Sequence, residues 1–138
     1  MLDERPTAAE LVAAVAEFLE REAGPALTGP LAFHARVAAG ALRIVGRELA
    51  DGPGTTAAEL SRLRALTHAD ADLPTLNALL AAKIQAGELS TADDAVRDHL
   101  IRSVLARLAI DNPRYPSLAE AERRWPDVQP PAHGGSPR

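Results

Sequence analysis

The spacing of apolar residues is the feature that most limits how this sequence can fold. In several stretches, apolar side chains recur every three or four residues, which places them on one side of an α-helix. No stretch alternates apolar and polar residues in the manner of a half-buried strand. Alanine and leucine are abundant and β-branched residues are sparse, which favours helices that pack closely through small side chains. The sequence therefore predicts an all-α protein.

Capping residues and helix breakers divide these stretches into segments. Thr7 and Glu10 have the spacing of a capping box, and Gly24-Pro25 is expected to end the first helix. The sequence DGPG at 51–54 predicts a second break, and Thr56 with Glu59 repeats the capping box just after it. We expect five helices, at about residues 8–23, 31–50, 55–67, 73–86 and 94–110.

The later boundaries follow the same logic. HADAD at 68–72 predicts a turn, Asp72 can cap the fourth helix, and Pro74 fits its first turn. The inward side chains of the last two helices should repeat at helical spacing: Leu73, Leu76, Leu80 and Ile84 in the fourth, and Val96, Leu100, Val104 and Leu108 in the fifth.

Short connections between these helices favour antiparallel neighbours in one bundle. We therefore expect a single five-helix bundle over residues 1–116. Residues 117–138 should form a short helical turn followed by a flexible tail that is rich in proline and glycine. A chain of 138 residues buries roughly two thirds of its unfolded surface, which suffices for a core without metal or disulfide links.

Composition argues against several classes of function. The net charge of -4 and an aromatic content of 3% disfavour nucleic-acid binding, which needs a basic surface or stacking aromatic rings. No stretch approaches the ~20 apolar residues that span a bilayer, and the charged start MLDERPTAAE does not resemble a secretory signal. The absence of cysteine excludes disulfides and thiol catalysis. We expect a cytoplasmic protein with no membrane or nucleic-acid partner.

Motifs for catalysis and for cofactor or metal binding are absent. The phosphate-binding patterns GxxxxGK[ST] and GxGxxG do not occur, and neither do GxSxG or HExxH. In HADAD, His68, Asp70 and Asp72 are too few for a calcium loop, which also needs a glycine at its sharp turn. We therefore expect no catalytic residue, no cofactor and no metal.

The second expected helix combines a wide apolar arc with a basic stripe. At about 100° per residue, His34 shares one face with Ala38, Ala41, Val45 and Leu49. The apolar arc, expected to be buried, is widened by Phe33, Val37 and Ile44. Three arginines lie on the opposite side beside a glycine: Arg36, Arg43, Arg47 and Gly40.

Each of these features has two explanations. His34 is either partly buried with one polar partner or exposed at a groove or interface. The arginines form either a solvated surface or a docking site for an acidic partner or a phosphate, since a guanidinium fits both groups. Gly40 lowers helix stability by about 1 kcal/mol relative to alanine, and a close helix contact, inside the bundle or with another protein, would justify it.

The sequence IDNPRY at 110–115 is the other group of candidate contact residues. Asn112 precedes a proline and is expected to leave the helical region, which ends the fifth helix. The chain end then either folds back onto the bundle or presents an exposed hook to a partner. The candidate contacts are Asp111, Asn112, Arg114 and Tyr115.

Three segments together carry a resemblance to a known family. In order, they are RPTAAELVAAVAEFL, LAFHARVAAGALRIVGREL and LAIDNPRY. The chain resembles, over about residues 4–115, an uncharacterised family of small all-helical bacterial proteins. Gly40 lies where that family is expected to have a larger polar residue such as asparagine. The residues that match the family are Arg5, Pro6, Phe33, His34, Arg36, Val37, Asp111, Asn112, Pro113, Arg114 and Tyr115.

The resemblance implies a function by association. Members of the family are typically encoded beside a kinase of the aminoglycoside-phosphotransferase type and an acyl-CoA dehydrogenase. The implied role is a non-catalytic accessory subunit that binds and supports a kinase acting on hydroxyacyl-CoA. Two alternatives remain open: a stand-alone ligand binder or enzyme with a cleft at His34 and Arg36, and a structural homodimer that pairs through the second helix.

Overall fold

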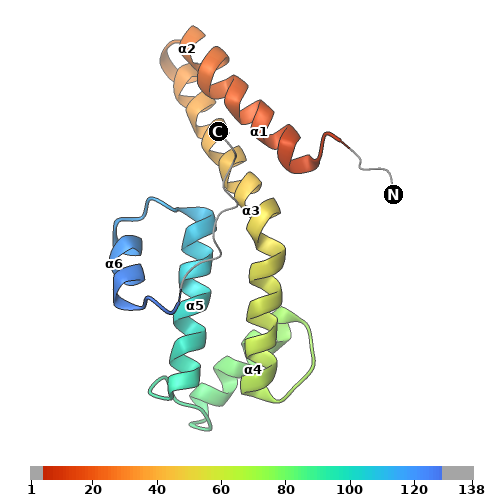
Figure 1. Cartoon of the computed structure of the whole chain (residues 1–138), viewed down its shortest axis with the longest axis vertical. Coiled ribbons are helices and arrows are strands. Elements are labelled where there is room, and N and C mark those ends of the chain that lie inside the picture. Colours follow the sequence, from red (N-terminus) through yellow and green to blue (C-terminus); the bar gives the residue numbers. More distant parts are fainter. Residues whose placement is uncertain (1–4, 129–138) are drawn as a thin grey trace. The chain divides into compact units, whose positions relative to one another are not determined.

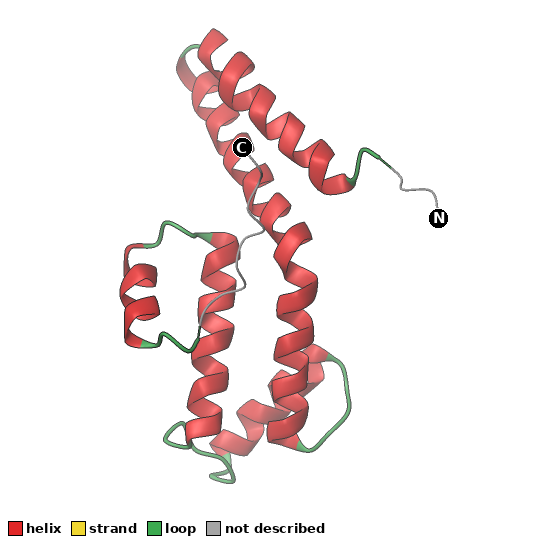
Figure 2. Cartoon of the chain, in the orientation of Figure 1, coloured by secondary structure: helices red, strands yellow, loops and turns green. Residues whose placement is uncertain are grey.

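The computed structural model describes residues 5–128 of the chain, and the described part is all-α (Figure 2). It contains no strand and five helices of nine or more residues, which confirms the predicted fold class. These helices are α1 (Ala8–Phe18), α3 (Gly29–Thr67), α4 (Leu73–Gln85), α5 (Asp94–Asp111) and α6 (Pro116–Arg124) (Figure 1). A π-helical turn, η1 (Leu19–Ala23), and the short α2 (Gly24–Ala26) lie between α1 and α3.

The chain divides into two compact units, Met1–Gly52 and Pro53–Arg138. The first unit contains α1, η1, α2 and the N-terminal part of α3, and we call it the hairpin. The second unit contains the rest of α3 together with α4, α5 and α6. The division into residues 1–116 and 117–138 stays a prediction, and the expected tail falls largely on residues 129–138, outside those described.

The first helix begins as its capping box predicts. The Thr7 hydroxyl accepts a hydrogen bond from the Glu10 N–H at 3.2 Å, and the Glu10 carboxylate accepts one from the Thr7 N–H at 2.7 Å. The second of these bonds is the main reason why the pKa of Glu10 lies below its usual value.

The helix does not stop at Gly24-Pro25, so that prediction is wrong. The chain continues through η1 into α2, and Leu27 is the first residue to leave the helical region. A proline ring in a regular α-helix would collide with the carbonyl group four residues earlier. The wider π-helical turn, in which the Gly24 N–H donates to the Leu19 carbonyl, precedes Pro25 and relieves this conflict.

The break predicted at DGPG is also wrong. α3 runs without interruption for 39 residues, with Pro53 inside it, so Thr56 and Glu59 cap no helix start. A proline inside a helix removes one hydrogen bond and costs about 3 kcal/mol. The helix continues because packing holds it on both sides, through Ala39 in the hairpin and Leu63 in the second unit.

Small side chains make the contact between the helices of the hairpin. α1 and the N-terminal part of α3 run antiparallel (Figure 1). The buried apolar side chains of the hairpin are Ala16, Ala35 and Ala39, and a Cβ added at Gly46 would lie 3.9 Å from a methyl of Val12. Close packing through small residues therefore joins α1 to α3.

Two apolar clusters of large side chains stabilise the second unit. In the first, Leu63 of α3 packs with Leu76 and Leu80 of α4. In the second, Leu105 of α5 packs with Leu118 of α6 and with Val128. The predicted inward stripe of the fourth helix and the short helical turn expected at the start of residues 117–138 are thus both found.

The predicted inward stripe of the fifth helix is wrong at Leu100 and Val104, which are exposed. α5 is contacted on two sides, by Arg62 of α3 at His99 and by the α6 cluster at Leu105. Leu100 and Val104 lie on the remaining side of α5, since helical rotation places them between those two contacts.

The turn between α3 and α4 behaves as predicted. His68 ends α3 in a left-handed conformation, with φ at 53°. The Asp72 carboxylate accepts a hydrogen bond from the Thr75 N–H at 2.9 Å, and the Thr75 side chain, together with this backbone bond, lowers the pKa of Asp72. Asp70 forms an ion pair with Arg64 at 2.9 Å, so the acids of this turn have structural partners.

Candidate functional site

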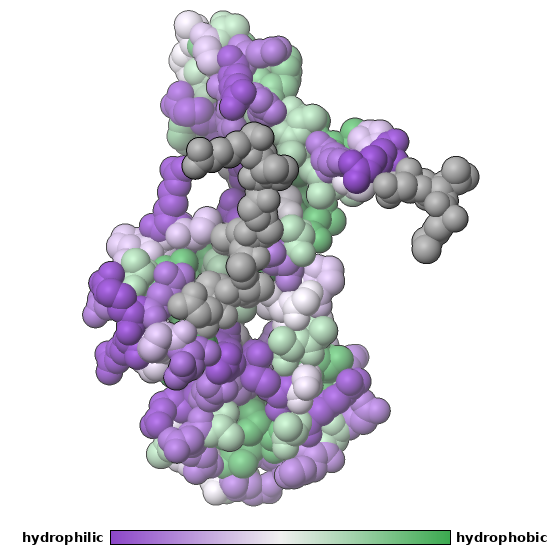
Figure 3. Space-filling view, in the orientation of Figure 1, coloured by the Kyte–Doolittle hydropathy of each residue, from purple (hydrophilic) through white to green (hydrophobic). Residues whose placement is uncertain are grey.

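The surface of the hairpin exposes most of its large apolar side chains. Their exposed fractions run from 37% to 62%, and Figure 3 shows hydrophobic residues reaching the surface of this unit. The prediction that this apolar arc of the second helix is buried is therefore wrong. The alanine contact brings α1 and α3 together and leaves the larger residues outside it. They are Leu11, Val15, Phe18, Leu27, Leu31, Phe33, Val37, Ile44, Val45 and Leu49.

Part of this apolar surface forms one continuous face across both helices. Each helix touches the other along one line, which we call the contact line. A residue that directly precedes a contact residue points about 100° away from this line around the helix axis. Because the two helices run antiparallel, this rotation leads to the same side of the hairpin in both. We call this side the apolar face, and its large exposed residues are Leu11, Val15 and Phe18 from α1 and Leu31, Val45 and Leu49 from α3.

Several charged residues of the hairpin lie on the opposite side. Residues that directly follow a contact residue include Glu17 and Glu20 on α1 and Arg36 and Arg47 on α3. On this side, Arg43 donates from Nε and Nη2 to the two carboxylate oxygens of Glu20 at 3.1 Å and 2.7 Å. These bonds lower the pKa of Glu20 and raise that of Arg43. One arginine of the predicted stripe is therefore already paired within the hairpin.

A third surface runs along the side of α3 that points away from α1. Helical rotation places four exposed residues there, and we call them the outer stripe: Phe33, Val37, Gly40 and Ile44. A Cβ added at Gly40 would meet no heavy atom within 4 Å. A close contact inside the hairpin therefore does not explain this glycine.

His34 is exposed, and its ring meets the edge of Phe33 with the ring centroids 5.7 Å apart. Its side chain makes no hydrogen bond or ion pair with any other residue in the range 5–128. The alternative of a partly buried histidine with a polar partner is thus not found. His34 and Arg36 point to different sides of α3, because residues two apart on a helix do not face each other.

The candidate contacts at residues 111–115 form a tight turn in the second unit. Asp111 accepts hydrogen bonds from Arg107 at 2.8 Å and 2.7 Å and is therefore paired within α5. The Asn112 carbonyl accepts from the Tyr115 N–H at 3.0 Å, and the chain turns directly into α6. The turn folds the chain back on α5 and leaves Arg114 and Tyr115 exposed. These residues belong to the second unit, and the candidate residues of α3 belong to the hairpin.

Sequence reasoning missed a buried polar group between α3 and α5. Arg62 donates from Nε to Nδ1 of His99 and from Nη2 to the Ser103 hydroxyl, both at 3.2 Å. Burial lowers the pKa of His99, and the neighbouring Arg62 lowers it further. His99 is therefore a neutral acceptor, and its burial assigns it a structural role. Its spacing from Val96 and Ser103 on one helix face was the available signal.

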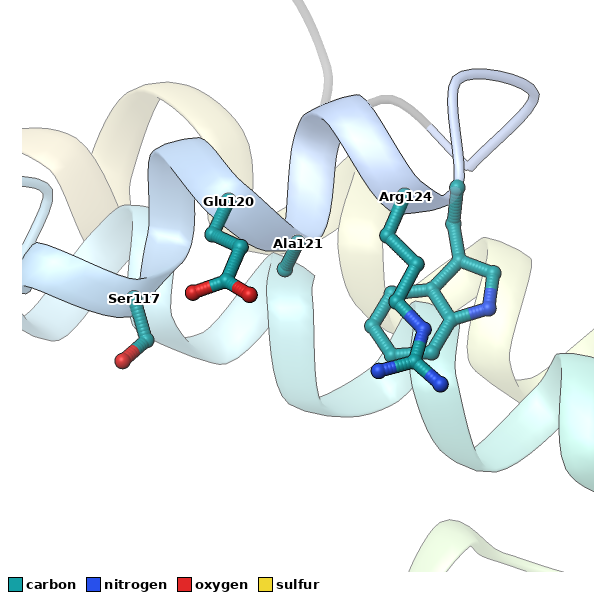
Figure 4. A pocket seen from close by; sticks show the side chains of 5 residues that line it. Ser117, Glu120, Ala121 and Arg124 are labelled. Carbon is teal, nitrogen blue, oxygen red and sulfur yellow. The ribbon is translucent and has the colours of Figure 1, made fainter.

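A shallow pocket of about 180 Å³ lies along α6 (Figure 4). It is lined by Ser117, Glu120, Ala121, Arg124 and Trp125, and the Arg124 guanidinium lies 5.1 Å from the centre of the Trp125 ring. Small-molecule sites typically enclose about 300–1,000 Å³, so this pocket is too small for a buried ligand. Trp125 instead packs against the cluster around Leu105.

Within residues 5–128, no three acidic or histidine side chains come together in a group that suits a metal ion. In the same range, no helix has both the length and the apolar character needed to cross a bilayer.

Comparison with known proteins places the chain in a family. The model of a domain of unknown function, DUF6285, matches residues 25–115, about two thirds of the sequence. The chain belongs to the DUF6285 family. The DUF6285 match includes α3, α4 and α5, the outer stripe and the turn at residues 111–115, whereas α1 lies outside it. No curated protein and no solved structure matches the chain.

Proposed function

We propose that this chain is a non-catalytic accessory subunit that binds an aminoglycoside-phosphotransferase-like kinase acting on hydroxyacyl-CoA and supports its activity. The observation that carries the proposal is the outer stripe of α3. Phe33 and Val37 are each more than half exposed, and Arg36 borders them on the charged side of the hairpin. These three residues are also among those that carry the family resemblance.

The outer stripe has the chemistry of a docking helix. Phe33, Val37 and Ile44 follow the spacing of an amphipathic helix that lies in a groove. Aromatic residues and arginine are enriched at the centres of protein interfaces, where they account for much of the binding energy. Gly40 has open space around it and lets the backbone of a partner approach closely. The kinase would present an apolar groove with a carboxylate for Arg36.

The kinase supplies the chemistry in this proposal. Phosphoryl transfer requires groups that position ATP, magnesium and the acceptor hydroxyl, and the kinase is the partner that contains them. This chain would hold the kinase in an active conformation or stabilise it against unfolding. Its contribution is then visible only when both proteins are present.

Co-expression with the neighbouring phosphotransferase-like kinase tests the proposal. The two chains should co-elute on size exclusion, and kinase activity on hydroxyacyl-CoA should fall when this chain is omitted. Val37→Glu would place a charge on the outer stripe and weaken binding at least about tenfold, or ~1.4 kcal/mol. Val104→Glu on α5 is the matched control, because Val104 is 58% exposed and Val37 is 53% exposed.

Separate elution with unchanged kinase activity would sink the accessory-subunit proposal. Equal binding by the Val37→Glu and Val104→Glu variants would remove the outer stripe as the docking surface. Circular dichroism of each variant checks that the helices are retained.

A further inference from the structure

We infer that the apolar face of the hairpin is covered by the same face of a second copy of this chain, so that two hairpins form a four-helix bundle. This inference uses a different surface from the outer stripe and does not depend on the proposed kinase.

The spacing of the residues on the apolar face is that of a helix bundle. On α3, Leu31, Ala38 and Val45 repeat every seven residues, and Leu42 and Leu49 continue a second seven-residue series. On α1, Leu11, Val15 and Phe18 follow alternating spacings of four and three. Such spacings keep an apolar seam directed at neighbouring helices that run nearly parallel or antiparallel to it. The missing partner is therefore helical, and a second hairpin supplies two such helices.

The chemistry of the face suits contact with itself. A two-fold axis places one patch against an identical patch, so any charge near the axis would meet the same charge. The six large residues of the apolar face are uncharged, and Glu17, Glu20 and Arg43 lie on the other side of the hairpin. Helical rotation places His34 at the edge of the face and Glu22 at its α2 end, so its centre is apolar.

The area of the face matches the requirement of a stable dimer. Its six large residues are each about half exposed, so at ~150–200 Å² per large side chain, the lower part of the range for aromatic residues, they offer on the order of 450–600 Å². A standard interface buries about 800 Å² per partner, and about 65% of a homodimer interface is apolar, or about 520 Å². The face supplies this amount.

The second unit has no comparable surface to offer. Among the described residues from 53 to 128, the large apolar side chains that are exposed are Leu100, Val104 and Tyr115. A second copy of the hairpin carries the full complementary set.

Light scattering on size-exclusion fractions of the full chain tests the inference directly. The unmodified chain should have twice the mass of one copy, and dilution should shift it toward the single mass. Val15→Glu and Val45→Glu should each lower dimer affinity at least about tenfold. Val104→Glu should remain dimeric. Because Val15 and Val45 are exposed in the isolated hairpin, neither change disturbs the internal packing of the fold.

The natural absence of cysteine allows a second measurement. Single-cysteine variants Val15→Cys and Val45→Cys should react with a maleimide at least about tenfold more slowly when the chain is dimeric, and dilution should restore the rate. Val104→Cys should react at the same rate at all concentrations. This test needs no loss of dimer and so does not depend on a disruptive substitution.

Two results would overturn the inference. One is a single-chain mass at every accessible concentration. The other is a dimer that survives both Val15→Glu and Val45→Glu. The kinase experiment is read separately, since the Val45→Glu chain retains its outer stripe. A monomer that still binds the kinase would contradict the dimer alone, whereas a dimer that does not bind the kinase would contradict the proposed function alone.

Discussion

The hairpin and the second unit differ in which apolar side chains they bury. The second unit buries large side chains completely, including Leu63, Leu76, Val96 and Ile110. The buried apolar residues of the hairpin are alanines, and its leucines, valines and phenylalanines are mostly exposed. Burying a large aliphatic or aromatic side chain contributes roughly 1.5–3 kcal/mol, and an alanine contributes far less. The second unit therefore stabilises itself, whereas the hairpin needs an external surface to cover its apolar residues.

The two units also use their polar groups differently. The second unit contains a buried hydrogen-bonded group, Arg62 with His99 and Ser103. The hairpin has the exposed pair of Arg43 with Glu20, which solvent and salt screen. The interior of the second unit therefore depends on specific polar partners, and the hairpin depends on apolar area.

The largest expected effect contrasts truncation in the two units. Leu63→Ala removes a fully buried side chain and should lower the free energy of unfolding by about 2–5 kcal/mol. Leu31→Ala removes a side chain that is 62% exposed. When the chain is dilute enough to be monomeric, this change should lower the free energy of unfolding by less than about 1 kcal/mol. Urea unfolding, monitored by circular dichroism, compares the free energies of unfolding of the two variants. Equal losses would contradict the contrast between the units.

The next effect concerns the junction between the units, where α3 contains Pro53. Pro53→Ala restores a backbone N–H that can donate to the Leu49 carbonyl, and it should raise the free energy of unfolding by up to about 3 kcal/mol. Gly54→Ala is the milder control at about 1 kcal/mol, since its added Cβ would meet open space. Thermal unfolding measures both. A lower melting temperature for Pro53→Ala would mean that the junction needs the proline.

The free energy of unfolding, measured as a function of pH, should show the contribution of His99, which belongs to the second unit. The pKa of His99 is lowered from 6.5 in the folded chain, so the unfolded chain binds more protons at mildly acidic pH. Stability from this group is complete above pH 6.5 and declines as the pH falls from there toward the lowered folded pKa. His99→Gln should flatten this decline. An unchanged decline in His99→Gln would assign it to other groups.

The smallest effect is expected at the start of the hairpin. Thr7→Ala removes the hydroxyl that accepts from the Glu10 N–H and should cost about 1 kcal/mol of helix stability. Thr7→Ser keeps the acceptor and should behave like the natural chain. Amide hydrogen exchange along α1 detects the fraying. Because the hairpin has little core to compensate, equal protection in Thr7→Ala would show that its partner surface, and not the cap, holds α1 in place.

Local sequence signals were reliable where a few neighbouring residues settle the outcome. The capping box at Thr7 and the cap at Asp72 were predicted correctly, because a side-chain oxygen three residues before an N–H needs no distant partner. The signals at Gly24-Pro25 and at DGPG failed for the complementary reason. A helix-breaking residue imposes only a local free-energy cost of a few kcal/mol. The stabilisation from packing of the flanking segments is larger than this cost.

The candidate site shows the same limit. Periodicity correctly grouped Val45 with Leu49 on one face and Arg36 with Arg47 on another, but it assigned the apolar face to the interior. A repeat of three and four residues marks a surface that must be covered, and it does not say what covers it. His99 illustrates the converse, since its partner Arg62 lies 37 residues away in the sequence and only the fold brings them together.

The sequence by itself determined that this chain is all-helical, where α1 and α4 begin, and which side chains share a helix face. These are properties of short segments, in which spacing and capping act between near neighbours. The tertiary structure alone decided that α3 continues through Pro53, that alanines make the contact in the hairpin, and that the large apolar residues of α1 and α3 stay exposed. The physical reason is that burial is a competition among all segments for a limited set of contacts, and small side chains permit the closest approach.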